Sequence, residues 1–418
     1  MTEPAPIVFE ELAAARRTLR VAVVTETYPP ELNGVAVTAA RFIEGLRALD
    51  HQIQLVRPRQ GAADAGGPGH VLVRGIAIPR YADLRLGLPA KAALERLWSL
   101  RRPDVVHIVT EGPLGWSALR AATKLRLPVV SDFRTNFHAY SSHYGVGWLK
   151  KPILAYLRKF HNRTLATLVP TAALRAQLAL LGFLRLRVIA RGVDTRLFSP
   201  ARRDEQLRAQ WGAAPEDPVL VYVGRIAAEK NLATLMSAYE ETRRRSPRAK
   251  LVLVGEGPLR RDLESRFPEA VFAGRRSGED LARHFASGDV FFFPSLTETY
   301  GNVTLEAMAS GLAVVAFDYA AAAEVIEHDT SGVLVPFDDN RAFVSHAAAL
   351  AAAPSRVRGI RQHARQAVAS RSWDAVVREL EAVLIAAADG RAALPSGHEI
   401  RNPLLGARRL ALRRGQGL

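Results

Sequence analysis

The feature that most constrains the fold is a series of short apolar runs, rich in valine and isoleucine, separated by amphipathic stretches of helical length. Runs that are apolar throughout are typical of strands buried on both faces, as in a parallel sheet covered by helices. The runs form two series, and we predict strands at 19–24, 53–56, 71–73, 104–109, 128–131 and 165–169, then at 219–223, 250–254, 271–273, 290–294, 313–317 and 332–335. The sequence therefore predicts an α/β fold in which two doubly wound, parallel-sheet domains face a central cleft.

The chain has 418 residues, a length that suits two domains better than one. The join between the two series falls near residues 191–194, just before a polar, proline-containing stretch. The expected divisions are an N-terminal domain over 1–192, a C-terminal domain over 193–372, a late helix over 373–390 that packs back across the domains, and a basic tail over 391–418.

Composition narrows the class of protein. There is no cysteine, no apolar run long enough to span a membrane and no signal-peptide pattern at the N-terminus, so we expect a cytoplasmic protein. The net charge of +16 suggests nucleic acid, an anionic membrane or an anionic small substrate as partner, or simply many solvated arginines. No helix-turn-helix, zinc or RNA-binding signature is present, so no specific nucleic-acid partner is predicted.

The first strand of the second series ends in a loop that carries two cations, Arg225 and Lys230. Doubly wound sheets bind ligands outside the carboxyl ends of their strands, where this loop is expected. Two cations within reach of one diphosphate favour phosphate binding over the alternative of solvated surface charges.

The stretch from Phe293 to Glu306 predicts a buried strand, a polar loop and a helix capped by Asn302. Free N–H groups of Val303 and Thr304 would form an anion site at the start of that helix. Glu298 in the loop and Glu306 in the early helix would flank a phosphate and accept sugar hydroxyls. Taken singly, each acid also fits a solvated loop residue or a favourable charge in a first helical turn.

Metal and nicotinamide chemistry are not expected. The sequence has no Asp-x-Asp element at a strand end, no His or Cys cluster with metal-ligand spacing and no Gly-x-Gly-x-x-Gly fingerprint. Gly34 does open a predicted helix after the first strand, which suits either close approach of an anion or a simple turn.

In these residues the chain resembles family 4 of the retaining glycosyltransferases, which have the GT-B architecture of two facing Rossmann-like domains. The resemblance covers roughly residues 19–388 and rests on Glu298 and Glu306 separated by seven residues, on Gly224-Arg225 with Glu229-Lys230, and on ordered matches in segments 192–200 and 254–258.

The resemblance implies that Arg225 and Lys230 hold the donor diphosphate, Glu298 contacts the donor sugar, and Glu306 contacts the nucleotide ribose. It also implies that Gly34 approaches the donor phosphates and that Arg275, within segment 275–278, lies at the nucleotide base.

Within the family, segments 25–30 and 297–306 look closest to a mannosyltransferase branch that uses GDP-mannose, without a metal, to extend a lipid-linked or saccharide acceptor. The alternatives are a UDP-sugar-dependent glycolipid synthase, of the sulfoquinovosyl- or glucosyl-diacylglycerol type, and a nucleotide-sugar-binding protein without turnover.

One stretch departs from the family pattern. Where the family usually carries a histidine, at the end of an N-domain strand near the reacting centre, this sequence has Arg134, and His138 follows four residues later. An arginine cannot act as a general base at neutral pH. The expectation is that Arg134 acts electrostatically on the departing phosphate and that His138 orients the acceptor.

A cationic amphipathic stretch, residues 148–163, follows this loop. Leu149, Ile153, Leu157 and Phe160 share one helical face, which would lie either on an anionic membrane or in the domain's own core. Together with the basic tail at 401–418, the stretch predicts an enzyme peripheral to the inner face of the membrane.

Overall fold

The computed structural model describes residues 16–31, 34–61, 63–78, 81–134, 150–298 and 300–390. Its first sheet has seven parallel strands. In order across the sheet these are β3 (His70–Val73), β2 (Gln52–Pro58), β1 (Arg20–Val24), β6 (Val105–Ile108), β7 (Val129–Asp132), β8 (Ala166–Val169) and β9 (Leu186–Val188). The helices that follow these strands are α1 (Gly34–Ala48), α2 (Lys91–Leu100), α3 (Pro113–Lys124), α5 (Lys150–His161) and α6 (Ala172–Leu180).

The second sheet has six parallel strands. They lie in the order β12 (Val271–Gly274), β11 (Lys250–Val254), β10 (Val219–Val223), β13 (Val290–Phe293), β14 (Ala313–Phe317) and β15 (Val333–Val335). Its helices are α7 (Glu205–Gln210), α8 (Leu232–Arg245), α9 (Arg260–Arg266), α10 (Gly278–Ala286), α11 (Asn302–Ala309), α12 (Ala320–Val325), α13 (Asn340–Ala351) and α14 (Pro354–Val368), with short 3₁₀ turns at η2 (Pro200–Arg202) and η3 (Ala228–Lys230). The two parallel sheets confirm the predicted α/β fold.

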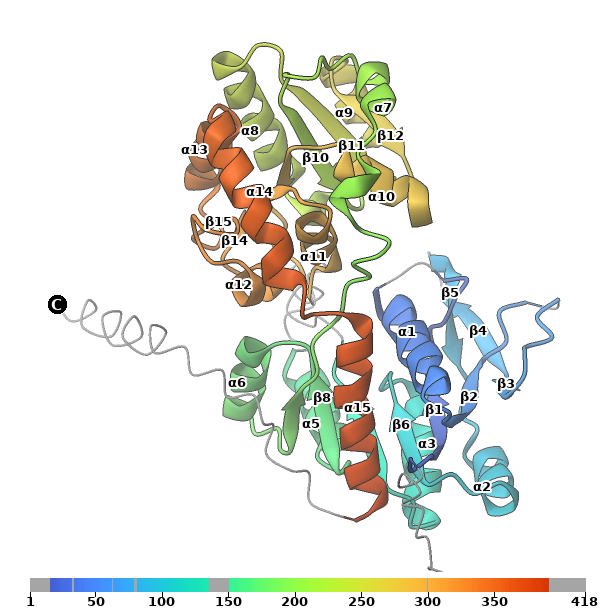
Figure 1. Cartoon of the computed structure of the whole chain (residues 1–418). Coiled ribbons are helices and arrows are strands. Elements are labelled where there is room, and N and C mark those ends of the chain that lie inside the picture. The colour runs from blue at the N-terminus through green and yellow to red at the C-terminus, as the bar shows by residue number, and fades with distance from the viewer. Residues whose placement is uncertain are drawn as a thin grey trace, which may run out of the picture.

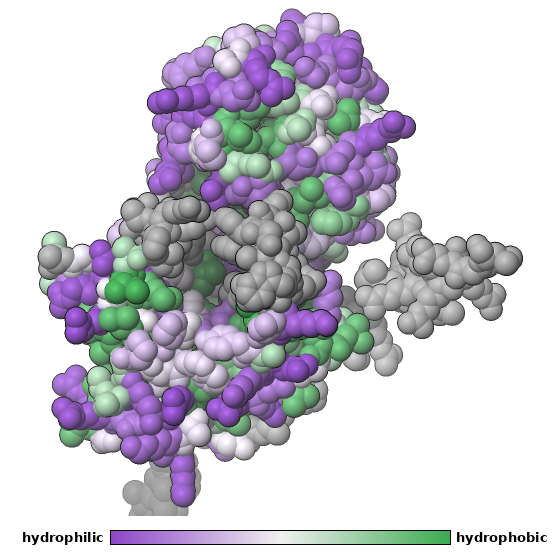
Figure 2. Space-filling model, turned by 180° about the vertical axis from the view of Figure 1, so that it is seen from behind, coloured by the Kyte–Doolittle hydropathy of each residue, from purple (hydrophilic) through white to green (hydrophobic). Residues whose placement is uncertain are grey.

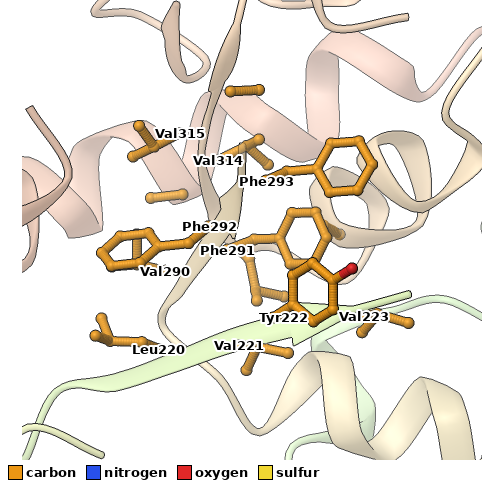
Figure 3. Packing of buried hydrophobic residues seen from close by; sticks show 14 of the residues in the cluster. Leu220, Val221, Tyr222, Val223, Val290, Phe291, Phe292, Phe293, Val314 and Val315 are labelled. Carbon is orange, nitrogen blue, oxygen red and sulfur yellow. The ribbon is translucent and has the colours of Figure 1, made fainter. Parts of the chain in front are cut away.

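Aromatic and β-branched side chains fill the core of the second sheet (Figure 3). On β13, Phe291 and Phe293 stack with ring centroids 5.5 Å apart, while Phe292 contacts Phe343 of α13 at 6.3 Å. Successive side chains of a strand point to opposite faces, so both faces of β13 are covered. This explains why the strand reads as an unbroken apolar run.

Each sheet reverses its strand order at one place, where the loops that follow the two adjacent strands lead away to opposite sides. The reversal lies between β1 and β6 in the first sheet and between β10 and β13 in the second. Val24 pairs with both Val56 and Ile108, so β1 and β6 end at the same level and β2 continues two residues further, to Pro58. Ligands of doubly wound sheets bind at such switch points. The loops after β10 and β13, which the sequence singled out, flank the switch point of the second sheet.

The chain passes between the two halves twice, and the two passages touch. Val193 forms a β-bridge with Ser372, and its N–H donates to the carbonyl of Arg371 at 2.9 Å. After the second passage, α15 (Trp373–Ala388) returns to the first half and packs against α1 (Figure 1).

Three details differ from the predictions. A two-stranded antiparallel hairpin, β4 (Gly75–Ile78) and β5 (Tyr81–Gly87), and the short strand β9 were not predicted. The apolar face of α5 is not free for a membrane, because Leu157 and Phe160 are buried in the protein core. Leu149 and the tail at 401–418 lie outside the described residues.

Figure 2 shows the face opposite to Figure 1, on which apolar residues form separate groups among hydrophilic ones. Among the residues that the structure describes, no helix is both long and apolar enough to cross a membrane.

Candidate functional site

The loop after β10 carries its two cations in different surroundings. The Tyr222 hydroxyl donates to the carbonyl of Arg225 at 2.9 Å and fixes the backbone there. The Arg225 side chain is 65% exposed and pairs with Glu229 at 2.8 Å. Lys230, at the end of η3, is largely buried and pairs with Glu298. Each cation therefore has one carboxylate partner, and Arg225 is the more accessible of the two to a ligand.

Glu298 is positioned from three sides in the loop after β13. The Ser295 hydroxyl donates to its Oε1 at 2.8 Å, and the Tyr319 hydroxyl donates to its backbone carbonyl at 2.6 Å. The Thr297 hydroxyl donates to the carbonyl of Glu229 at 3.0 Å and joins this loop to the β10 loop. The structure thus brings Lys230 and Glu298, predicted as parts of one site, into direct contact.

Close backbone contacts join the neighbouring loops of the second sheet. The Gly224 N–H donates to the carbonyl of Val254 at 3.0 Å, and the Gly255 N–H donates to that of Gly274 at 2.9 Å. A Cβ on Gly255, whose φ is +148°, would lie 1.9 Å from the Gly224 carbonyl oxygen. Only glycine fits there. Arg275, directly after this contact, is exposed at the open edge of the sheet.

The start of α11 differs from the prediction in two respects. The N-cap is Gly301, with φ of +92°, and Asn302 is the first helical residue. The Asn302 side chain accepts a hydrogen bond from Arg191 and caps no helical N–H. The second difference is that the Thr304 N–H, predicted to be free, donates to the Gly301 carbonyl at 3.1 Å.

Glu306 lies further along α11. Burial raises the pKa of its carboxyl to about 7, an effect that the nearby Arg41 charge opposes. Near neutral pH this side chain therefore exists in both protonation states, so it can donate as well as accept hydrogen bonds.

Arg134, just beyond β7, is buried rather than exposed to solvent. Its Nε donates to Asp132 at 3.1 Å, and Asp132 also contacts His107 Nε2 at 3.0 Å. Its guanidinium lies over the Phe42 ring, 5.3 Å from the centroid. Burial disfavours the charged form of Asp132, but the charges of Arg134 and His107 outweigh it and hold the pKa of Asp132 below its usual value. His138, the partner expected for Arg134, lies outside the described residues.

Arg191 is a site residue that the sequence did not reveal. It lies where the chain first passes between the halves, and its Nη1 donates to Asn302 Oδ1 at 3.2 Å. A Cβ added to Gly34, the first residue of α1, would lie 3.0 Å from the same Nη1. Burial first and the charge of Arg134 second lower the pKa of Arg191 to about 9. Its burial could not be foreseen, because its sequence context reads as a polar linker.

Cations from both halves of the molecule contribute to the candidate site. Arg225 and Lys230 lie at the switch point of the second sheet, Arg134 extends from the first, and Arg191 lies near both Arg134 and Glu298. Such an array stabilises negative charge on a bound or departing group. Within the described part of the chain, no group of three acidic or histidine side chains could hold a metal ion.

Comparison with known proteins agrees with this geometry. Residues 32–197 match the family described as Glycosyltransferase Family 4, and residues 217–370 match Glycosyl transferases group 1. The chain is 33% identical over 368 residues to the GDP-mannose-dependent alpha-mannosyltransferase of Mycobacterium tuberculosis, which covers 87% of this chain and 95% of that protein. It is 33% identical over 321 residues to the sulfoquinovosyl transferase SQD2 of Arabidopsis thaliana, which covers 75% of this chain and 62% of that protein.

A solved structure, the sucrose-phosphate synthase of Thermosynechococcus elongatus, matches 87% of this chain and 98% of its own with a TM-score of 0.72 at 20% identity. That likeness concerns the GT-B fold. The two family matches and the relative of similar length at 33% identity show that the chain belongs to glycosyltransferase family 4 and is a glycosyltransferase.

Proposed function

We propose that this protein transfers a hexose from a nucleotide sugar to a lipid-linked or saccharide acceptor, with GDP-mannose as donor, an α-glycosidic product and no metal requirement. The observation that carries the proposal is the pairing of Lys230 with Glu298 beside Arg225, at the switch point of the second sheet. A cation for the diphosphate is thereby adjacent to an acceptor of sugar hydroxyls. The relative named as a GDP-mannose-dependent mannosyltransferase supports the choice of donor.

In this proposal the protein stabilises the leaving group electrostatically. The bond between sugar C1 and the phosphate oxygen breaks while C1 bonds to the acceptor oxygen on the same face. The acceptor proton passes to the departing phosphate oxygen, so no protein base is needed, and a nucleoside diphosphate leaves. Each cation within about 4 Å of the diphosphate contributes up to roughly 4 kcal/mol at an effective dielectric near 20. Arg225 and Lys230 fill this role, and Arg134 adds charge from the first sheet.

The test is a binding and turnover panel. GDP, UDP and ADP with their sugars are compared by thermal shift, with and without EDTA, and mannose transfer is followed by release of GDP. We expect the largest shift with GDP-mannose, unchanged by EDTA. Preference for a UDP-sugar would overturn the donor assignment, and loss of activity in EDTA that Mg²⁺ restores would overturn the metal independence.

Two variants examine the diphosphate contacts. Arg225→Gln and Lys230→Gln should each weaken GDP binding roughly tenfold or more, because each removes a charge-assisted contact to phosphate. Arg244→Gln is the matched control, since Arg244 is similarly exposed at 70% and also pairs with one nearby carboxylate, Glu241. Equal GDP affinity in all three variants would contradict the site.

Two alternatives follow from specific observations. The similarity to a sulfoquinovosyl transferase favours a UDP-sugar-dependent glycolipid synthase as the second candidate, which the same panel would detect. The replacement of the expected histidine by Arg134 is the reason to consider a nucleotide-sugar-binding protein without turnover. Binding of GDP-mannose without hydrolysis or transfer would favour that reading.

We also propose that the acceptor is reached at the inner face of an anionic membrane. Lys151, Arg158 and Lys159 of α5 are exposed and lie on one side of that helix, which suits electrostatic attachment without insertion. Lys151→Glu with Lys159→Glu should abolish sedimentation with phosphatidylglycerol vesicles. The same reversal at Arg244 and Arg245 of α8, far along the chain, should leave it intact, and sedimentation insensitive to both pairs would contradict the proposal.

A further inference from the structure

Two buried guanidinium groups near the domain junction lack the partners that buried polar groups normally have. Arg134 and Arg191 are only 2% and 4% exposed. Among the described residues, Nη1 and Nη2 of Arg134 and Nε of Arg191 have no hydrogen-bond partner. Buried donors in folded proteins are nearly always paired, so donors left open in this way call for a missing acceptor.

The same chain provides a contrasting case. Arg208 is 1% exposed, and its guanidinium bonds to the Ser287 carbonyl at 2.9 Å, to Asp289 at 3.0 Å and to the Asp217 carbonyl at 2.9 Å. The Nε of Arg208 has no hydrogen bond but lies 3.3 Å from a carboxylate oxygen of Glu205, so this structural guanidinium has acceptors or an anion on every side. Within the described ranges, Arg134 bonds to one carboxylate, through Nε, and Arg191 bonds to a neutral amide.

The electrostatics point the same way. The two guanidiniums are close enough that the charge of Arg134, after burial, is the largest influence lowering the pKa of Arg191. Asp132 supplies one negative charge, and Glu298 also acts on Arg191 but is already paired with Lys230. The two like charges are therefore not fully balanced in a buried region, and an anionic ligand would relieve their repulsion.

The position of the pair identifies the kind of anion. Arg134 extends from the first sheet, and Arg191 contacts both Asn302, the first residue of α11, and the position of Gly34, the first residue of α1. Two helix starts thus meet at the Arg191 guanidinium, and the Arg134 guanidinium lies over Phe42 of the same helix α1. Helix starts favour negatively charged groups, and a phosphate has enough oxygens to accept from both forks at once.

We propose that Arg134 and Arg191 form an anion site for a phosphate group, distinct from the Arg225–Lys230 pair and shared between the two halves of the molecule. In the reading that rests on the proposed function, this is the distal phosphate of the donor, which is held here while Arg225 and Lys230 hold the remainder of the diphosphate. A phosphate carried by the acceptor has the same chemistry and is the other source.

The experiment compares Arg134→Lys and Arg191→Lys with Arg208→Lys as the buried-arginine control. Lysine keeps the charge but loses the fork. Calorimetry measures binding of GDP, GMP and glycerol 3-phosphate. If the source is the donor, the two site variants bind GDP roughly tenfold more weakly and GMP unchanged. If the source is the acceptor, GDP affinity is kept, and glycerol 3-phosphate binding to the GDP complex weakens by a similar factor. Unchanged affinity for all three ligands in both site variants overturns the proposal.

A second variant protects the test against misfolding. Arg191→Gln removes a buried, poorly paired charge, so without ligand its Tm should equal or exceed that of the wild-type protein. The rise in Tm on adding GDP should shrink if the donor is the source, and the rise on adding glycerol 3-phosphate should shrink if the acceptor is the source. A lowered Tm with the full ligand-induced rise would make Arg191 structural and overturn the proposal. If the wild-type protein binds neither GDP nor UDP, the proposed function fails. Inorganic phosphate that binds to the wild-type protein and not to Arg191→Gln would still support the site.

Discussion

Glu306 lies partly buried on α11, and burial raises the pKa of its carboxyl from 4.5 to about 7. Between these two values the folded protein holds a proton that the unfolded chain has released. The free energy of unfolding therefore falls as pH rises through this window. Glu306→Gln removes the effect, so it should stabilise the protein at pH 8 by up to about 3 kcal/mol and leave stability at pH 4.5 nearly unchanged. Urea unfolding at the two pH values measures both.

The control for this prediction is Glu216→Gln, since Glu216 is exposed in the loop before β10. It should change stability little at either pH. A Glu306→Gln variant that is less stable than the wild-type protein at pH 8 would mean that the ionised carboxylate has a favourable partner. In that case Glu306 would stabilise the fold, and its carboxyl would not be left unpaired for a ligand.

At the scale of single residues, the sequence was informative where a charged side chain directly follows a predicted strand. Arg225, Lys230 and Glu298 could be predicted because charged side chains directly follow buried strands, and parallel strands end at one edge. Arg191 could not be predicted, because its significance lies in burial and in contacts to Asn302 and Gly34, which are far away in the chain. Asn302 was predicted to be the N-cap of α11, but it is the first helical residue, because Gly301 with its left-handed backbone is the N-cap.

At the scale of elements, Gly192 controls how the chain passes between the sheets. A Cβ on Gly192 would lie 2.6 Å from the backbone nitrogen of Trp373 and 2.7 Å from its Cα. Backbone atoms at the start of α15 cannot move aside as a side-chain tip can. Gly192→Ala should therefore destabilise the protein by about 1–3 kcal/mol, measured by urea unfolding.

Gly359 offers the opposite case for comparison. It lies inside α14, and a Cβ there would meet no atom within 4 Å apart from the helix's own backbone. Gly359→Ala should stabilise the protein by up to about 1 kcal/mol, because alanine favours the helix. If Gly192→Ala behaves in the same way, the two passages of the chain are not packed as tightly as the structure has them.

Elements were predictable in proportion to their apolar periodicity. Every strand of the second sheet was found, because each is a buried run such as Val290–Phe293. The hairpin of β4 and β5 was missed because Gly75 begins β4 and Arg85 and Gly87 interrupt the apolar pattern of β5, and β9 is only three residues long. For α5, the periodicity predicted which face is apolar but not whether that face contacts the protein core or a membrane, because both produce the same pattern.

At the scale of the whole molecule, the last helix completes the first half of the chain. Val376, Val377, Leu380 and Leu384 of α15 share a core cluster with residues of β1 and α1. Glu381 of α15 accepts from Arg16 at 2.8 Å and contacts His51 at 2.9 Å, and His51 accepts from the Leu19 N–H at 2.9 Å. The first half of the molecule is therefore completed by a helix from the far end of the described chain, and the second sheet lies between the two in sequence.

This arrangement predicts where damage to α15 will be felt. Leu380 is fully buried in the cluster of the first half, so Leu380→Ala should cost about 2–5 kcal/mol and speed amide hydrogen exchange in β1 and α1 while β10 and β13 keep their protection. Leu350 is equally buried in the core of the second half, and Leu350→Ala should reverse the pattern. Exchange that rises equally in both halves for either variant would mean that the two sheets unfold as one cooperative unit. If the responses separate as expected, each half holds its own side of the site rigid, and a ligand that contacts Arg134 and Asn302 together must couple two independently stable parts.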